Sequence, residues 1–308
     1  MREMRYPPLL LMPGPRRVAS AAARCALALV AVLGTSLGGL DAASGPVIVR
    51  MGGRGASSAL SDALGEKLPA ARIVELSGDL PADTARISRE TRGVSVLFAI
   101  GSDATEAAGE ARGPAVVSLG VANPAQVKTP GIYVSMYPKL DRVFDYVKGT
   151  LKATRVGLVF SPAKNREIGL QFLKAGSAQG VTVVPVPIGS SGDLVREIKG
   201  ALSNVDALLL AVDPIVFEPA SLEFIVREAR AANKPTVGFL EGLAHLGVTV
   251  SLVARPEEAA EAAIAASAQP VLIGKKRLEV EGMAVVTAKK AGDGAASGGE
   301  ALRAQTRP

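Results

Sequence analysis

The sequence is short of the residues that carry most enzyme chemistry. Among its 308 residues there are one histidine, one cysteine and no tryptophan, and aromatic residues make up only 4%. The cysteine, Cys25, lies near the amino terminus, so the chain beyond residue 44 offers no disulfide, no thiol nucleophile and no cysteine metal ligand. Zinc sites depend on nitrogen and sulfur ligands, which this chain does not supply. We therefore expect no enzyme activity, no metal and no cofactor.

The single histidine, His245, is the only one that a Ser-His-acid triad could recruit. Beyond residue 44 the sequence contains no Gly-x-Ser-x-Gly nucleophile elbow. His245 falls in Leu243–Leu246, a segment whose composition favours a helix. We expect this histidine to be partly buried and structural.

Long basic runs are missing as well. The formal net charge is +6, and residues 1–44 contribute half of it through five arginines set against one glutamate and one aspartate. The remaining positive charge is dispersed, without a patch that would follow a phosphate backbone. This distribution predicts no nucleic-acid partner.

Residues 1–44 have the features of an export signal. A basic region precedes the apolar stretch Cys25–Leu40, and Ala42 and Ser44 suit a small-residue cleavage site. The alternative is an uncleaved membrane anchor, but a spanning helix needs about 20 apolar residues and this stretch is shorter and interrupted by glycine. A lipoprotein cysteine closes the apolar stretch, whereas Cys25 opens it. We therefore expect a signal peptide, no lipid anchor and a periplasmic location.

The rest of the chain repeats one pattern twice. Each half holds four apolar runs whose spacing leaves room for a short helix between successive strands. Alternating strand and helix patterns imply βαβ units and a parallel sheet, and the run Ala207–Val212, which shows no alternation, suits a strand covered on both faces. The eight runs begin near Val47, Arg72, Val94, Pro114, Arg155, Val181, Val205 and Pro235.

Apolar residues at helical spacing predict the connecting helices. Leu194, Ile198 and Leu202 recur at steps of four, with Ser190 or Ser191 available as the N-cap. Further helices are expected over residues 83–91, 140–151, 219–232 and 256–269.

These patterns predict an α/β protein of two lobes with parallel sheets. The first lobe takes residues 45–130 together with about 248–270, and the second lobe takes residues 155–241. Residues 131–154 form a hinge-linking helix, and residues 271–288 form a returning segment. Residues 289–308, rich in glycine, alanine and serine, form a disordered tail.

In open parallel sheets ligands bind beyond the carboxyl ends of the strands, and this rule selects a few loops. Gly101–Thr105 follows a strand and opens a helix whose amide groups suit a carboxylate. Asp213 and Glu241 follow two strands of the second half and suit a positive group, so the halves together suit a zwitterion such as an amino acid. The alternative is that Ser102 and Asp103 only cap the helix and that each acid is structural.

Two other features give weaker evidence for a ligand. Gly52–Ser58 loosely resembles a dinucleotide-binding loop, but it lacks the third glycine of Gly-x-Gly-x-x-Gly, and a plain turn or a single ligand-lining loop fits it better. Five aromatic residues fall near the expected cleft, where they would flank an apolar part of a ligand or pack in the core: Tyr133, Tyr137, Phe160, Phe217 and Phe239.

The second half resembles the substrate-binding proteins of one bacterial ABC-transporter family, the group that includes tryptophan- and tyrosine-type amino-acid binders. The resemblance covers about residues 94–290. In the first half, Gly101–Thr105 and Val121–Pro124 look like the family's ligand loops. The blocks of the second half that carry it are Arg155–Pro162, Gly180–Pro187, Asp206–Phe217, Lys234–Gly247 and Gly274–Ala291.

The resemblance implies a type I periplasmic-binding-protein architecture, in which two Rossmann-like lobes close on a small ligand that is passed to a membrane permease. Arg166 stands where the family often has a small hydroxyl residue, and Val47–Leu68 matches the family's opening segment poorly, so an acidic or larger ligand stays open. The loops together nominate seven ligand-binding residues: Ser102, Asp103, Thr105, Asn123, Asn165, Asp213 and Glu241.

These observations together favour the extracytoplasmic solute-binding component of an ABC importer, holding a small polar ligand between two lobes. The alternative is a binding module that has lost its transporter and acts as a sensor or accessory protein. An α/β enzyme is disfavoured by the scarcity of histidine and cysteine.

Overall fold

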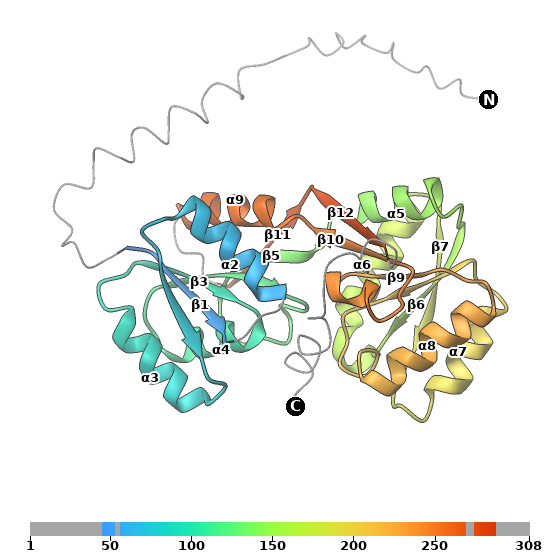
Figure 1. Ribbon diagram of the computed structural model, residues 1–308, viewed down its shortest axis with the longest axis horizontal. Helices are drawn as coiled ribbons and strands as arrows, with labels where there is room; N and C mark the ends of the chain where they lie inside the picture. Colours follow the sequence, from blue (N-terminus) through green and yellow to red (C-terminus); the bar gives the residue numbers. More distant parts are fainter. Residues whose placement is uncertain (1–44, 53–55, 269–273, 288–308) are drawn as a thin grey trace, which may run out of the picture. The chain divides into compact units, whose positions relative to one another are not determined.

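The computed structural model describes residues 45–52, 56–268 and 274–287 of the chain (Figure 1). The predicted signal peptide over 1–44, the predicted tail over 289–308 and the central residues of the glycine loop 52–58 lie outside the described residues. Within the described ranges no helix has the length and apolarity that crossing a membrane requires.

The first lobe is built on a six-stranded sheet with the order β11-β5-β4-β3-β1-β2, in which every neighbouring pair is parallel. Its central strands read as continuous apolar runs because helices cover both faces of the sheet. The strands are β1 (Val47–Met51), β2 (Arg72–Leu76), β3 (Val96–Ile100), β4 (Ala115–Val121), β5 (Gly131–Pro138) and β11 (Lys275–Val280).

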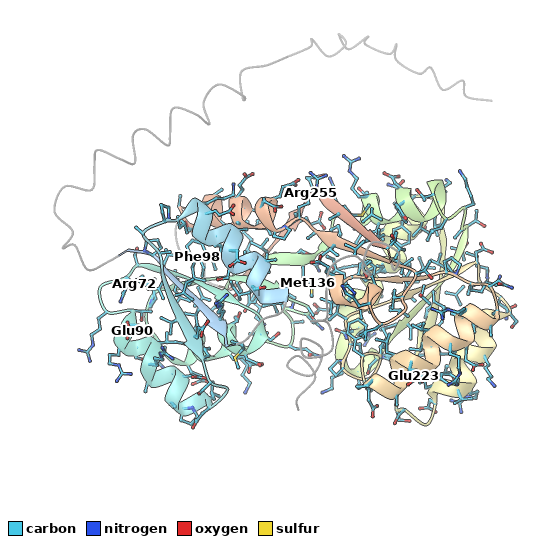
Figure 2. All side chains as sticks on the ribbon, in the orientation of Figure 1. Arg72, Glu90, Phe98, Met136, Glu223 and Arg255 are labelled. Atoms are coloured by element: carbon cyan, nitrogen blue, oxygen red, sulfur yellow. The ribbon has the colours of Figure 1, made fainter. Side chains whose placement is uncertain are left out.

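Four helices cover this sheet. Side chains of α2 (Ala56–Lys67) and α9 (Pro256–Ser267) share one core layer with Phe98, which Figure 2 labels. Side chains of α3 (Leu80–Glu90) and α4 (Ser102–Glu110) share the opposite layer with β1 and β3. The edge strand β2 is tied to the end of α3 by the ion pair of Arg72 and Glu90 at 3.1 Å, also labelled in Figure 2.

The second lobe has a six-stranded sheet of the order β12-β10-β9-β8-β6-β7. Only the edge strand β12 is antiparallel to its neighbour, and the other pairs are parallel. The strands are β6 (Arg155–Phe160), β7 (Thr182–Pro187), β8 (Ala207–Leu210), β9 (Thr236–Gly238), β10 (Val250–Ala254) and β12 (Met283–Thr287).

Helices again cover both faces of the second sheet. α5 (Leu140–Gly149) and α6 (Pro162–Ala178) form one core layer, and α7 (Leu194–Leu202) and α8 (Pro219–Ala231) form the other. A short 3-10 helix, η1 (Glu241–Ala244), follows β9. Leu194, Ile198 and Leu202 are buried in the second layer, as their spacing predicts.

The chain passes between the lobes at three places that lie side by side. The first follows β5, the second follows β10 and the third joins β11 to β12. The backbone amide of Lys139 donates to the carbonyl of Val280 at 2.9 Å, and the amide of Arg255 donates to the carbonyl of Gly282 at 3.2 Å. A hydrogen-bonded hinge of three crossings therefore connects two sheets that are otherwise separate.

The expected α/β class and all eight apolar runs are confirmed as strands, whereas two parts of the expected lobe assignment differ from the structure. Residues 131–154 are not a hinge helix alone, because β5 occupies 131–138 in the first sheet before α5 begins. Residues 248–270 do not belong to the first lobe as a block: β10 pairs with β9 of the second sheet, while α9 packs against α2, β4 and β5.

The returning segment 271–288 is likewise shared between the lobes. β11 joins the first sheet and β12 joins the second. These exchanges depend on pairing between strands that are distant in sequence, which a local apolar pattern does not encode.

Candidate functional site

A cavity of about 260 Å³, which we call the polar hollow, lies where loops of both lobes meet at the carboxyl ends of their strands. The first lobe contributes the start of α4 and the loop after β4, and the second contributes the start of α6 and the loop after β8. The lining residues with polar side chains are Ser102, Glu106, Asn123, Gln126, Asn165 and Asp213. Four of the seven residues nominated from the sequence therefore lie around one cavity.

A chain of side-chain hydrogen bonds crosses between the lobes at this cavity. Asn123 Nδ2 donates to Asn165 Oδ1 at 3.2 Å, and Asn165 Nδ2 donates to Asp213 Oδ2 at 2.7 Å. Asn123 belongs to the first lobe, and the other two belong to the second. All three side chains are buried, so the seam between the lobes is closed by polar groups that satisfy one another.

The backbone at the start of α6 is shaped for this contact. Asn165 has non-helical angles (φ −129°, ψ 29°) that interrupt the helix after its first turn. The carbonyl of the preceding residue, Lys164, accepts a hydrogen bond from Asn123 Nδ2 at 2.7 Å and another from the side-chain amide of Gln126. The first-lobe loop thus binds a second-lobe backbone group that an unbroken helix would use internally.

Asp213 organises the second-lobe side of the hollow. Its Oδ2 accepts the backbone amide of Ser161 at 2.9 Å as well as Asn165 Nδ2, and its Oδ1 accepts the amide of Ile215 at 2.9 Å. Three of its roughly four acceptor positions are therefore used within the protein. Asp213 is 1% exposed and holds the loops after β6 and β8 together.

The three candidates at the start of α4, Ser102, Asp103 and Thr105, have different surroundings. Gly101 is the N-cap, with a positive φ of 90° and no side-chain cap, so neither Ser102 nor Asp103 caps the helix. Ser102 lines the polar hollow, whereas Asp103 is exposed and lines neither cavity of the seam. Thr105 is fully buried, and its hydroxyl donates to the carbonyl of Gly101 at 2.7 Å. The structure therefore places Thr105 in a supporting position.

Glu241 lines a second, smaller cavity of about 90 Å³, which we call the apolar hollow. Its walls include Gly101 and Gly120 of the first lobe and Met136 (labelled in Figure 2) and Phe239. Gly101 and Ser102 are consecutive residues, so both hollows adjoin the start of α4. Glu241 thus faces the seam but not the same cavity as Asp213.

Two basic residues of β11 support the site and were missed by the sequence reasoning. Lys275 Nζ donates to the carbonyl of Pro124 at 2.7 Å and to that of Val127, fixing the loop that carries Asn123. Arg277 donates to Ser135 Oγ at 2.9 Å and to the side-chain oxygen of Gln171 on α6. Burial lowers the pKa of Arg277. The local sequence does not predict these contacts of Lys275 and Arg277, because β11 reaches the site only by pairing with β5.

Three aromatic side chains pack together in a core layer of the second lobe. Tyr137, Phe172 and Phe239 pack edge to face, with ring centroids 5.1 to 5.6 Å apart. The hydroxyl of Tyr137 accepts the amide of Val212 at 3.0 Å, and burial raises the pKa of this tyrosine well above its usual value. Of the five aromatics expected near the cleft, Phe217 lines the polar hollow and Phe239 the apolar hollow.

Among the described residues no group of three or more His, Cys, Asp or Glu side chains is placed to hold a metal ion. His245 follows the short helix η1 and is exposed, so the expectation that it is partly buried is wrong.

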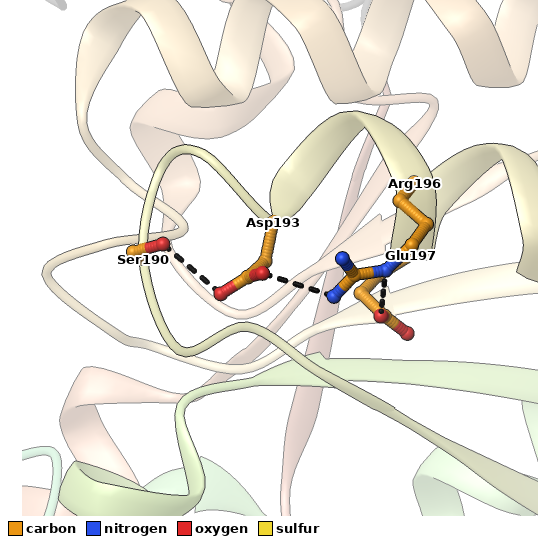
Figure 3. A network of polar contacts seen from close by, with 4 residues as sticks. All are labelled: Ser190, Asp193, Arg196 and Glu197. Carbon is orange, nitrogen blue, oxygen red and sulfur yellow. Dashed lines mark hydrogen bonds and ion pairs between the residues drawn. The ribbon is translucent and has the colours of Figure 1, made fainter.

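Polar networks also occur outside the seam. At the start of α7, Asp193 accepts from Ser190 Oγ at 3.0 Å and from Arg196 at 2.9 Å, and Arg196 also pairs with Glu197 (Figure 3). The hydrogen bond from Ser190, followed by that from Arg196, lowers the pKa of Asp193. These side chains lie at the surface and line neither hollow, so the network is a helix-start feature.

A larger cavity of about 490 Å³ lies elsewhere, at the amino ends of β3, β4 and β5. Its walls come from the first lobe and α9, including Pro114, Gly131 and Ala266. Ligand sites of parallel sheets lie at the opposite, carboxyl ends of the strands. We therefore place the candidate site at the two hollows of the seam, despite their smaller volumes.

Comparison with known proteins identifies the fold. No protein-family model matches the chain, and no curated protein sequence matches it. Among solved structures, a ligand-free, open substrate-binding protein with adhesive properties from Clostridium difficile has a TM-score of 0.60 at 16% identity, over 79% of this chain and 91% of that one.

Two further structures agree. An ABC domain from Streptococcus pneumoniae in complex with L-Trp has a TM-score of 0.54 at 13% identity, over 81% of this chain and 94% of that one. The arabinose-binding protein AraP from Geobacillus stearothermophilus has a TM-score of 0.53 at 14% identity, over 82% and 99%. The chain therefore has the two-lobed fold of type I periplasmic binding proteins, and the expected fold class is confirmed.

Proposed function

We propose that this protein binds a small polar molecule between its lobes and delivers it to an ABC importer. The observation that carries the proposal is the seam itself, where polar side chains from both lobes surround two adjoining hollows. Structural neighbours that bind L-Trp and arabinose support a binding role for this fold.

Different residues around the hollows suit different parts of a ligand. Ser102 and the free amides of the first turn of α4 suit a negative or hydrogen-bonding group of the ligand. Asn123, Asn165 and Asp213 form the opposite wall and supply amide and carboxylate groups. Glu241, Met136 and Phe239 extend the site toward a less polar part of the ligand.

The hinge explains how binding becomes selective. A ligand that touches both lobes favours the closed arrangement by its differential affinity for that state. The hydrogen bonds from Asn123 and Gln126 to the carbonyl of Lys164 are lobe-to-lobe contacts that form only when the seam is closed. The ligand and these contacts therefore stabilise the same state.

Export and a membrane permease complete the proposal. The basic and apolar features of residues 1–44 support secretion of the chain into the periplasm. There the binding protein would present its closed, loaded form to the permease. Purified periplasmic fractions of the native host should contain the chain without these residues, as measured by intact mass.

The binding site is tested by blocking one hollow and not the surface beside it. Ser102→Phe places a large ring in the polar hollow, whereas Asp103→Phe places the same ring at the next residue, which lines neither hollow. A panel of amino acids, sugars and small carboxylates is screened by thermal shift and confirmed by calorimetry. We expect at least one to bind, S102F to abolish that binding and D103F to retain it.

Each outcome has a meaning. If no member of the panel binds the native protein, the proposed function is wrong. If S102F binds as tightly as D103F, the ligand does not occupy the polar hollow. Circular dichroism of both variants is the control for unfolding by either substitution.

A further inference from the structure

The lining of the two hollows has one sign of charge. It contains three carboxylates, those of Glu106, Asp213 and Glu241. Among the described residues that line the hollows there is no lysine and no arginine. The chain as a whole is positive, with 35 basic against 29 acidic residues, so the acidic lining does not follow from the composition.

Of the three carboxylates, that of Glu106 is available to pair with a ligand. It lies one helical turn after Ser102 on α4 and lines the polar hollow. It makes no hydrogen bond or ion pair with the residues that the structure describes, although its charge raises the pKa of the nearby Tyr133 further above the value that burial sets. Asp213, in contrast, already receives three protein hydrogen bonds.

The carboxylate of Glu241 is also available to pair with a ligand. It lies at the first turn of η1, lines the apolar hollow and has no hydrogen-bonding partner among the described residues. Each hollow is therefore lined by one carboxylate that has no hydrogen-bonding partner among the described residues.

The charge of the lining favours a positive ligand. A cavity lined by one sign of charge attracts the opposite sign. Glu106 and Glu241 are exposed, so their carboxylates are accessible to a ligand, whereas Asp213 is buried. Two cations lie behind the lining, because Lys275 donates to the carbonyl of Val127 and Arg277 donates to Ser135 Oγ, so three carboxylates are set against two positive groups. A neutral zwitterion would leave this excess of negative charge uncompensated, and an anion would add to it.

We infer that the ligand is a small molecule with a net positive charge, an amino acid with a basic side chain or a diamine, and that Glu106 sets this preference. The inference rests on the proposed function, because it names the class of molecule held at the same site. One amine lies against Glu106 and Asp213 in the polar hollow, and the second cationic group reaches Glu241 in the apolar hollow.

Calorimetry with defined probes tests the charge preference. The native chain is titrated with L-arginine, L-ornithine and putrescine, with the neutral amino acids L-leucine and L-tyrosine, and with L-glutamate and citrate. We expect the cations to bind at least tenfold more tightly than the neutral and anionic probes. The affinity for the cations should fall by about a few-fold or more as salt is raised from 20 to 300 mM, because salt screens the electrostatic attraction.

The role of Glu106 is tested by Glu106→Gln against Glu110→Gln. Glu110 is the last residue of the same helix, is exposed and lines neither hollow. E106Q should weaken cation binding about tenfold, the loss of one charge-assisted contact, while E110Q should bind as the native chain does. Because both glutamates are exposed, neither variant is expected to unfold.

The outcomes separate this inference from the proposed function. Binding of a neutral or anionic probe without binding of the cations overturns the inference and leaves the binding function standing. Equal cation affinities for E106Q and E110Q overturn the role of Glu106. A native chain that binds none of the seven probes, and none of the wider panel, contradicts the binding function itself.

Discussion

The side-chain amide of Asn123, in the first lobe, donates a hydrogen bond to the side-chain oxygen of Asn165, in the second, at 3.2 Å. The two residues are 42 positions apart in sequence, and each is anchored by a further contact of its own. Asn123 also reaches the carbonyl of Lys164, and Asn165 reaches Asp213. This bridge joins the lobes directly beside the polar hollow.

Removing the bridge should weaken binding. Asn123→Ala deletes the donor to Asn165 and to Lys164, so the closed state loses hydrogen bonds worth about 1 kcal/mol each. We expect the dissociation constant for any bound ligand to rise by up to about thirtyfold. Asn204→Ala, at an exposed position in the second lobe, is the matched control, and an unchanged affinity for N123A would contradict the role of the bridge.

Asp213 should matter for folding as well as for binding. Two backbone amides and one side-chain amide depend on its buried carboxylate. Asp213→Asn should lower the stability by about 1–3 kcal/mol, since the new NH₂ group replaces an acceptor.

Thermal denaturation without ligand measures this effect. We expect the Tm of D213N to fall by several degrees, about 2–4 °C for each kcal/mol in a chain of this size. An unchanged Tm would show that the loops after β6 and β8 hold together without the carboxylate.

Lys275 should act on ligand binding from a distance. Its ammonium group donates to the carbonyls of Pro124 and Val127, which lie in the loop that carries Asn123. Lys275→Met keeps the aliphatic stem and removes both hydrogen bonds. We expect a several-fold loss of ligand affinity with a small change in Tm, whereas Lys67→Met, which removes a surface ion pair on α2, should leave the affinity as it is.

Asp206 should make stability depend on acid pH. Its carboxylate accepts the backbone amides of Arg155 and Thr154 at 2.9 Å each, and these hydrogen bonds lower its pKa. A lowered pKa means that the stabilisation is complete above the unfolded-state value of about 3.9 and is lost as the pH falls through the folded-state value.

Denaturant unfolding of Asp206→Asn tests the sign. The variant should be about 1 kcal/mol less stable than the native protein at pH 7, and the difference should shrink below about pH 4. Asp145→Asn, at an exposed position of α5, is the control. A difference that grows as the pH falls would contradict the assignment.

Much of the local structure was predictable. The apolar run Ala207–Val212 indicated a covered strand, and β8 occupies its first part between two layers of helices. The rule that ligands lie beyond strand ends selected Ser102 and Asp213, which the structure brings to one cavity. Glu106 was within reach of the same reasoning, because it lies four residues after Ser102 on a predicted helix.

The order of strands and helices and the loops that close each strand were determined by the sequence alone, because apolar periodicity and glycine or proline punctuation act over a few residues. Tertiary structure decided which sheet β5, β10 and β12 join, since strand pairing depends on partners far along the chain. It also decided that Thr105 turns inward while Glu106 lines the polar hollow, because burial depends on what packs against a helix face and not on the helix itself.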